Sequence, residues 1–299
     1  MLSKRFFPLG LLCLFLLLLA TMPLYAQPYL VILLTTVFMY VVLTLSWAIF
    51  SGPTRYISLA SAAFFGVGVY LSAILGQALP LPLVIAFGGL VSFILALFIG
   101  LLTLRLRGMY FIIFTFGVSE LIRHFMLWWE TNFTGTVGRF VVAVDQTAVY
   151  YVMLVIFVMT LLTAHLMRRS KFGLALRSIG EQEEAALHIG INVTHLKAIT
   201  FAISAFFMGA AGAIMATRWT YIDPSIAFNP LSSFMPVLMA IFGGTGRLYG
   251  PILGAAILAF LEEVLITKFT YYYMLLFGII LIVVILFLPN GLVGLFKRR

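Results

Sequence analysis

Only one group of ionisable residues lies deep within an apolar stretch, and it comprises Glu120, Arg123 and His124. Spacings of three and four residues place these side chains on one face of a helix, where Glu120 and Arg123 can form an ion pair. A charge at the centre of a membrane costs about 2.5–3.5 kcal/mol, so it is normally paired or turned toward a polar path. We interpret Glu120 first as a structural partner of Arg123. A role in a polar path or in gating, and a proton relay, are the alternatives.

The remaining polar residues do not form the pattern of a catalytic or metal-binding site. His188 and His195 are seven residues apart with no acidic or cysteine ligand at regular spacing, and His124 and His165 belong to different apolar stretches. The sequence contains no Gly-Lys-Ser/Thr loop of the kind that binds the phosphates of ATP. We therefore predict that the chain is not an enzyme and that it holds no metal and no cofactor of its own.

The composition is typical of a membrane protein. Hydrophobic residues make up 64% of the 299 residues and charged residues only 9%, whereas about 25% of a soluble domain is charged. The net charge of +9 does not indicate nucleic-acid binding, because the basic residues cluster at the ends of apolar stretches. The single Cys13 excludes an internal disulfide. We expect one all-α integral membrane domain spanning residues 1–299.

Ten apolar stretches are candidates for membrane spans. They are residues 6–23, 29–50, 58–79, 82–104, 109–129, 148–167, 198–216, 234–249, 251–266 and 271–289. Lys and Arg fall mainly in alternate connections, so the positive-inside rule places both termini in the cytoplasm. The first stretch also resembles a signal peptide that would be cleaved near Ala26. We favour an uncleaved span, because ten spans then agree with both termini lying in the cytoplasm.

Small residues recur where membrane helices are expected to pack closely. Ala205, Gly209 and Ala213 repeat every four residues, and so do Gly246, Gly250 and Gly254. Two further places, Gly52-Pro53 and Gly243–Gly246, predict breaks in helices. In transporters such breaks often mark the path of the substrate.

One cytoplasmic connection, residues 168–197, is long and charged enough to form a structured segment. Its acidic residues are expected in the first turn of a short helix, where they complement the helix dipole: Glu181, Glu183 and Glu184. A small apolar face follows, comprising Ala185, Ala186 and Ile189. Gly190 is expected to end this helix, and Thr194 to cap the next one. Such a helix fits the groove of a partner protein, although a solvated surface helix has similar features.

Two connections on the opposite side of the membrane combine aromatic, hydroxyl and charged residues. We predict that they dock a soluble partner through Thr134, Gly135, Thr136, Arg139, Tyr221 and Asp223. Turn formation alone also accounts for glycine and for Asp-Pro at such positions, so this second interpretation stays open.

Three segments of the chain resemble a known family. They are Ser58–Tyr70, Arg177–Ala213 and Asp223–Gly254, and the similarity extends from about Tyr29 to Leu295. Together they resemble the membrane permease subunits of ABC importers for branched-chain amino acids. The middle segment carries the Glu-Ala-Ala and Gly-Ile-Asn-Val-Thr run of the family's cytoplasmic coupling loop.

The resemblance implies a set of partners and a location. Cytoplasmic ATPase subunits, which would bind ATP and Mg, are expected to dock on Glu181, Glu184, Ala185, Ala186, Ile189, Gly190, Ile191 and Asn192. An extracytoplasmic substrate-binding protein and a second permease subunit are expected as further partners. The chain is expected to be a multi-pass protein of the bacterial plasma (inner) membrane, in contact with membrane lipid.

The substrate and its path are predicted less directly. We expect the path to be lined by Ser58, Ser61, Phe64, Gly66, Gly68 and Glu120, and we expect Gly66→Trp to block transport without harming assembly. The run Thr134-Gly135-Thr136-Val137-Gly138 lacks the second glycine and the acidic residue that family members often carry. Related permeases for urea, short amides or other small solutes therefore remain an alternative. A self-sufficient secondary transporter is a further one.

Overall fold

The computed structural model describes residues 16–103, 106, 108–287 and 291–295 of the chain. Within these ranges the regular structure is helical apart from one pair of two-residue strands. The elements are, in chain order, η1 (Met22–Leu24), α2 (Pro28–Thr54), α3 (Ser61–Leu75), α4 (Leu81–Thr103), α5 (Met109–Trp129), η2 (Glu130–Thr134), β1 (Arg139–Phe140), α6 (Gln146–Arg169), α7 (Lys171–Glu181), α8 (Glu183–His188), α9 (Val193–Ala216), β2 (Tyr221–Ile222), α10 (Pro224–Ala227), α11 (Leu231–Gly243), α12 (Tyr249–Lys268), α13 (Tyr273–Phe287) and α14 (Gly291–Leu295).

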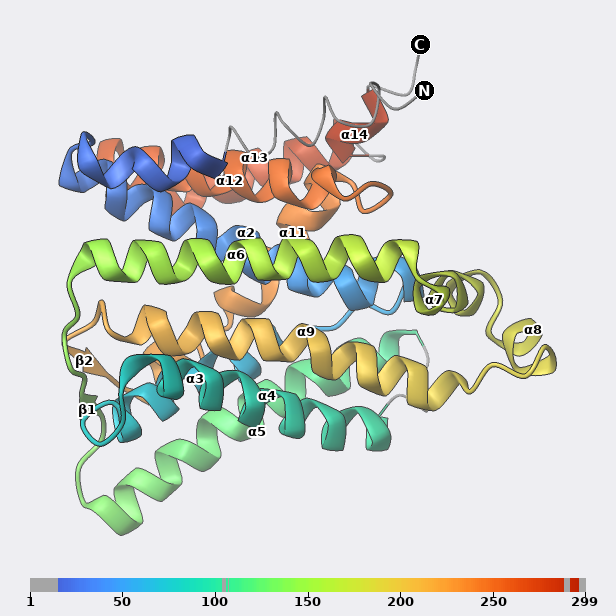
Figure 1. The fold of residues 1–299 in the computed structure, drawn as a ribbon, viewed down its shortest axis with the longest axis horizontal. Coiled ribbons are helices and arrows are strands. Elements are labelled where there is room, and N and C mark those ends of the chain that lie inside the picture. The colour runs from blue at the N-terminus through green and yellow to red at the C-terminus, as the bar shows by residue number, and fades with distance from the viewer. Residues whose placement is uncertain (1–15, 104–105, 107, 288–290, 296–299) are drawn as a thin grey trace.

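Long apolar helices confirm the prediction of an all-α integral membrane protein. Seven helical segments of the described chain are long and apolar enough to cross a membrane. They are Pro28–Thr54, Leu81–Thr103, Met109–Thr134, Gln146–Arg169, Val193–Ala216, Pro224–Gly243 and Tyr249–Lys268. Among them, α6 and α9 run along the long axis of the molecule (Figure 1).

Three of the ten expected spans differ from these seven. The first, residues 6–23, lies largely outside the described residues. The third was expected at residues 58–79, but its helix α3 has only 15 residues, because residues 55–60 lie outside any helix. The last corresponds to α13, which also has 15 residues.

Helix α9 lies at the centre of the bundle and packs against α3 and α4 through small residues. Ala205 and Ala213 are fully buried. A Cβ added to Gly209 would overlap the carbonyl oxygen of Gly88 in α4, and a Cβ added to Gly68 in α3 would overlap the carbonyl oxygen of Gly209. The predicted stripe of small residues in α9 is thus confirmed as a site of close helix packing.

Two helices begin inside the bundle rather than at one of its ends. Helix α3 starts at Ser61 and α11 at Leu231. Their starts meet where the Ala62 amide donates a hydrogen bond to Ser233 Oγ at 3.1 Å, and Ser233 is fully buried. Both elements are therefore discontinuous helices, a feature tolerated in membrane proteins where the freed backbone is buried in protein or lines a cavity.

The non-helical segment 55–60 leads from the end of α2 to the buried start of α3. Neighbouring side chains satisfy its backbone: Trp47 Nε1 donates to the Ser58 carbonyl at 2.9 Å, and Thr115 Oγ1 accepts from the Leu59 amide at 3.0 Å. The break predicted at Gly52-Pro53 lies slightly further along the chain, because α2 continues to Thr54 and ends at Arg55 in the left-handed region (φ 60°). The break predicted at Gly243–Gly246 is confirmed, since α11 ends at Gly243 and α12 starts at Tyr249.

The polar connections gather at two opposite ends of the bundle. Helices α7 and α8 project from one end, which we call the inner end, and the pair β1–β2 lies at the other, the outer end (Figure 1). Arg55 comes from one connection that was expected inside and Arg168 and Arg177 from another, and all three line one cavity at the inner end. The antiparallel pairing of Arg139 with Ile222 joins two connections that were expected outside. In these cases, connections that were expected on the same side of the membrane lie at the same end of the bundle.

Candidate functional site

The predicted coupling segment forms two short helices rather than one. Helix α7 starts after Ser170, whose hydroxyl accepts from the Gly173 amide at 3.3 Å. Helix α8 begins at Glu183, and Glu183 and Glu184 occupy its first turn as the charge pattern predicted. The same prediction for Glu181 is wrong, because Glu181 is the last residue of α7. Gln182 separates the two helices. The segment projects beyond the rest of the bundle (Figure 1).

Gly190 ends α8 as predicted. Its φ of +85° is in the left-handed region, which suits a residue without a Cβ. Its amide donates to the Leu187 carbonyl at 3.0 Å, and the Ile191 amide donates to the Ala186 carbonyl at 3.1 Å. These two bonds form a Schellman motif, a common way to satisfy the last carbonyls of a helix.

The cap of α9 differs from the prediction. Asn192, not Thr194, is the N-cap residue, and its side chain accepts from the His195 amide at 3.3 Å. Asparagine and threonine are both good N-cap residues. The end of α8 fixes the choice, because the Gly190 turn places Asn192 immediately before the first helical residue, Val193.

The exposed apolar residues of α8 and its C-cap are Ala185, Leu187 and Ile189. Leu187 and Ile189 are 51% and 72% exposed, but Ala186 is only 1% exposed and packs with Ile179 and Val193 inside the segment. The prediction that Ala186 lies on the exposed face is therefore wrong, because this side of α8 is needed to attach it to α7 and α9. Leu187 was missed, although it is the largest apolar side chain of α8.

A buried polar cluster ties α8 to the membrane helices. Lys197 in α9 is fully buried, and its Nζ donates to Glu183 Oε1 at 3.0 Å and to the Tyr56 hydroxyl at 3.2 Å. The Tyr56 hydroxyl donates to Glu183 Oε2 at 2.5 Å. Lys197 Nζ also lies 4.3 Å from the centre of the Tyr56 ring. We call these three residues the inner cluster.

The inner cluster joins three separate parts of the chain. Glu183 opens α8, Lys197 belongs to the first turns of α9, and Tyr56 lies in the segment that leads to the start of α3. The sequence reasoning did not find this cluster. One signal was available: Lys197 precedes the buried Phe201 by four residues and the buried Ser204 by seven, which places it on the buried face of α9.

A small buried cavity lies at the start of α3. It is lined by Trp47, Phe50, Ser51, Ser58, Ser61, Phe64, Phe201, Ser204 and Met208. The hydroxyls of Ser51 and Ser61 are buried and have no hydrogen-bond partner among the described residues. The free volume of about 10 Å³ is comparable to the space that one water molecule needs. We call it the serine cavity.

Three of the six predicted path residues line this cavity, and three do not. Ser58, Ser61 and Phe64 do. Gly66 and Gly68 lie against other chain segments instead: a Cβ on Gly66 would overlap the ring of Phe228. The expectation that Gly66→Trp leaves assembly intact is therefore wrong, because the added side chain would displace packed residues of the loop before α11.

Glu120 is also separate from the serine cavity. Its Oε2 accepts from Arg123 Nη2 at 2.6 Å, which confirms the predicted ion pair, and the two side chains are 24% and 27% exposed. His124 Nε2 lies 3.9 Å from the same oxygen. This group is on α5, which lies at the edge of the bundle (Figure 1) and is mostly not buried by the rest of the chain.

The residues predicted to dock a soluble partner come together at the outer end. Thr134, Gly135, Thr136 and Tyr221 are exposed, whereas Arg139 and Asp223 are half-buried. Arg139 pairs with the fully buried Glu130, Nε to Oε1 at 3.2 Å. Asp223 caps α10 by accepting from the Ile226 amide at 2.8 Å. The last two residues therefore shape the outer surface rather than form its most exposed part.

A family model decides the class of the protein. The model described as "Branched-chain amino acid transport system / permease component" matches residues 29–285. The chain belongs to this family. It is a permease subunit of the ABC importer type and a multi-pass protein of the bacterial inner membrane.

Several curated proteins are similar to this permease. The high-affinity branched-chain amino acid transport system permease protein LivM of Salmonella typhimurium is 26% identical over 301 residues, covering 89% of this chain and 70% of LivM. LivM of Escherichia coli gives the same identity and coverage. The high-affinity branched-chain amino acid transport system permease protein LivH of Escherichia coli is 31% identical over 129 residues, covering 42% of this chain and 41% of LivH. No solved structure matches the chain significantly.

The inner cluster of this permease generates a prediction on stability. Glu183→Ala removes a carboxylate that is hydrogen-bonded to the buried Lys197 ammonium, which should lower the free energy of unfolding by about 3 kcal/mol. Glu181→Ala, at an exposed carboxylate of α7, is the matched control and should change it by less than about 0.5 kcal/mol. Denaturant unfolding of the purified permease measures both. Equal effects of the two substitutions would contradict the assigned role of the cluster.

Proposed function

We propose that this chain is the membrane-spanning subunit of an ATP-driven importer for branched-chain amino acids. The family and the names of its relatives support this substrate class. ATP and Mg would bind to cytoplasmic ATPase subunits that dock on α8. An extracytoplasmic binding protein would deliver the amino acid to the outer end. LivM and LivH are permease proteins of one system in Escherichia coli, which supports a second permease subunit as the partner of this one.

The observation that carries the proposal is the physical continuity between α8 and the serine cavity. Glu183 of α8 is bonded to Tyr56, and Tyr56 is two residues before Ser58, which lines the cavity. If an ATPase subunit displaced α8, residues 55–60 would therefore be displaced with it. This segment sets the position of the start of α3. The Gly190 turn and the packing of Ala186 hold α8 in a fixed conformation, so that α8 would move as a rigid unit in such a displacement.

The chemistry of the serine cavity suits an apolar amino acid. The N-terminus of α3 carries a partial positive charge, and the unpartnered hydroxyls of Ser51 and Ser61 can donate to a carboxylate. Phe64, Phe201 and Met208 supply apolar contacts for a branched side chain.

The cavity is too small for an amino acid in this structure, so transport requires a second state. At about 10 Å³ it is closed to substrate. We infer that ATP binding and hydrolysis on the partner subunits shift the permease between closed and open arrangements of α3 and α11, as in other two-state rearrangements. Both starts lie inside the bundle and can shift while the glycine contacts further along α3, with α4 and α9, stay intact.

The proposed topology has ten spans within a single domain of residues 1–299, with both termini in the cytoplasm. The seven long helices, the shorter α3 and α13, and a span at residues 6–23 account for the ten. The clustering of Arg55, Arg168 and Arg177 at the inner end supports the cytoplasmic assignment of that end.

The second permease is proposed to contact α5. The ion pair Glu120–Arg123 lies near the middle of this helix, and both side chains are partly exposed on the bundle surface. Charged groups facing lipid are costly, whereas a protein partner can supply polar contacts. The same placement argues against a proton-coupled secondary transporter, because Glu120 is paired and does not line the serine cavity.

The substrate is tested by uptake of labelled leucine into proteoliposomes that contain this permease, its second permease, the ATPases and the binding protein. We expect uptake only with ATP on the ATPase side, and its loss in Glu184→Lys, which reverses the charge of an exposed residue at the start of α8. ATPase activity that remains coupled without leucine uptake would contradict the substrate and favour urea, short amides or another small solute. Uptake without any ATPase would contradict the importer class.

Two serine variants in the same assay test the path. Ser61→Ala should raise the KM for leucine about tenfold, since a hydrogen bond to a charged group contributes about 1.5–3 kcal/mol. Ser46→Ala is the matched control, because Ser46 is also buried with an unpartnered hydroxyl but does not line the cavity. An unchanged KM in Ser61→Ala would contradict the assignment of the path.

Photocrosslinking tests the α5 interface. In a chain with Cys13→Ser, Leu121→Cys on the exposed surface of α5 is labelled with a benzophenone maleimide and irradiated in the assembled importer. We expect an adduct with the second permease. Leu162→Cys on α6 is also exposed in the isolated chain (50%, against 67% for Leu121) and should give no such adduct. An adduct from α6 alone would place the interface elsewhere.

A further inference from the structure

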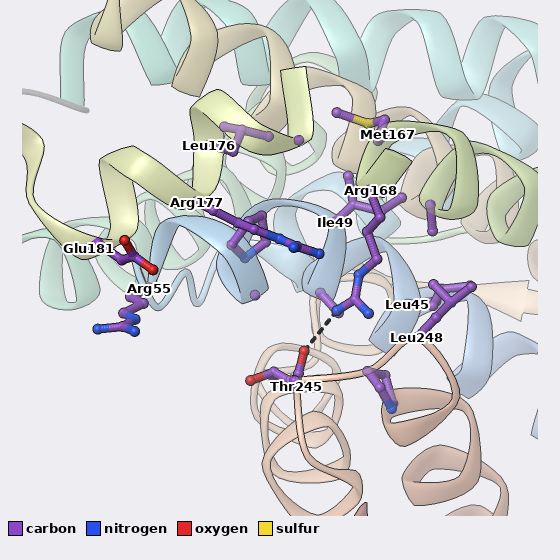
Figure 2. A pocket seen from close by; sticks show the side chains of 17 residues that line it. Leu45, Ile49, Arg55, Met167, Arg168, Leu176, Arg177, Glu181, Thr245 and Leu248 are labelled. Atoms are coloured by element: carbon purple, nitrogen blue, oxygen red, sulfur yellow. Dashed lines mark hydrogen bonds between the residues drawn. The ribbon is translucent and has the colours of Figure 1, made fainter. Parts of the chain in front are cut away.

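A larger cavity lies at the inner end and is distinct from the serine cavity. It is bounded by α2, α6, α7 and the turn that leads into α12 (Figure 2). Its volume of about 340 Å³ falls within the range of small-molecule sites, about 300–1,000 Å³. The proposed transport path does not use it.

The interior of this cavity is strongly basic. The Arg168 guanidinium points across it, and its Nη2 donates to the Thr245 carbonyl at 2.8 Å. The Arg177 side chain, which is itself exposed, extends into the cavity from α7, toward Arg168 (Figure 2). No carboxylate forms an ion pair with either arginine within the described residues. Two guanidinium groups therefore face one space without an anionic partner among the residues that the structure describes.

The single acidic residue of the cavity does not neutralise these two arginines. Glu181 lies at the outer edge of the cavity, near Arg55, and away from Arg168 (Figure 2). Because Glu181 lies beside Arg55 and away from Arg168 in Figure 2, we treat the interior as carrying the charge of two arginines. Planar guanidinium groups bind phosphate through paired hydrogen bonds, and they do so better than lysine.

An apolar wall adjoins the basic group. Leu45 and Ile49 of α2 line the cavity together with Leu248. A site that combines arginines with apolar helix surface at the cytoplasmic end of membrane helices suits the headgroup and the first chain atoms of an anionic phospholipid. A small hydrophilic anion would use only the arginines.

We propose that this cavity binds a phosphate group, carried by an anionic phospholipid, between Arg168 and Arg177. The bound phosphate would hold α7 against α2 and α12 and would remove the repulsion between the two arginines. Because α7 leads directly to α8, the lipid would stabilise the base of the coupling segment. In the sequence, these arginines indicated only the orientation of the chain in the membrane. In this proposal they also bind a ligand.

The test is lipid binding to the purified full-length permease, measured by native mass spectrometry. Phosphatidylglycerol is titrated against phosphatidylcholine, and inorganic phosphate is added in a separate arm. We expect retention of phosphatidylglycerol and not of phosphatidylcholine. Arg177→Gln should weaken phosphatidylglycerol binding about fivefold, from the contribution of one arginine near an anionic headgroup.

Arg169→Gln is the matched control, because Arg169 is exposed, follows Arg168 directly and does not line the cavity. It should leave binding unchanged. Arg55→Gln, at the edge of the cavity, is a second variant with an exposed side chain and should weaken binding less than Arg177→Gln. Inorganic phosphate that displaces the lipid at low concentration would support the phosphate site and overturn the lipid source. Equal binding by Arg177→Gln, Arg169→Gln and the unaltered chain would overturn the proposal.

Discussion

The interaction on which the account depends is the contact of the buried Lys197 ammonium with Glu183 and Tyr56. An ammonium removed from water is costly unless it is paired and hydrogen-bonded. Here both oxygens of Glu183 are used, one by Lys197 and one by the Tyr56 hydroxyl. The three groups therefore keep one arrangement, and α8, α9 and the segment before α3 are positioned relative to one another. The cluster therefore fixes the position of α8 and of its exposed apolar residues.

The rest of the bundle divides into a closely packed part and a part that can move. Glycine contacts hold α3, α4 and α9 together, and backbone atoms there approach too closely for side chains to intervene. The segment before α3 is held differently, by hydrogen bonds: Trp47 Nε1 and Ser119 Oγ donate to its carbonyls, and its Leu59 amide donates to Thr115 Oγ1. Such bonds can be exchanged at small cost between two arrangements. This contrast explains how a shift of α8 could reach the serine cavity without unfolding the bundle.

Local features of the sequence predicted local structure well. The acidic start of α8, its end at Gly190 and the small-residue stripe of α9 depend on residues a few positions apart, and the structure confirms them. The inner cluster and the strand pair could not be predicted, because they join residues far apart in the chain: Tyr56 with Lys197, and Arg139 with Ile222. Gly66 shows the limit of pattern reasoning, since a glycine in a small-residue run can serve packing or a path. Only its contact with Phe228 distinguishes the two.

The central claim is that α8 controls the start of α3 through the inner cluster. Its most direct test is the rate at which a methanethiosulfonate reagent labels Ser61→Cys, in a Cys13→Ser chain, within the reconstituted importer. We expect ATP with vanadate to change this rate at least about tenfold, since an opening of about 1.4 kcal/mol has that effect. The change should vanish in Glu183→Gln while the ATPase subunits stay bound. An ATP-dependent change of equal size in Glu183→Gln would contradict the account.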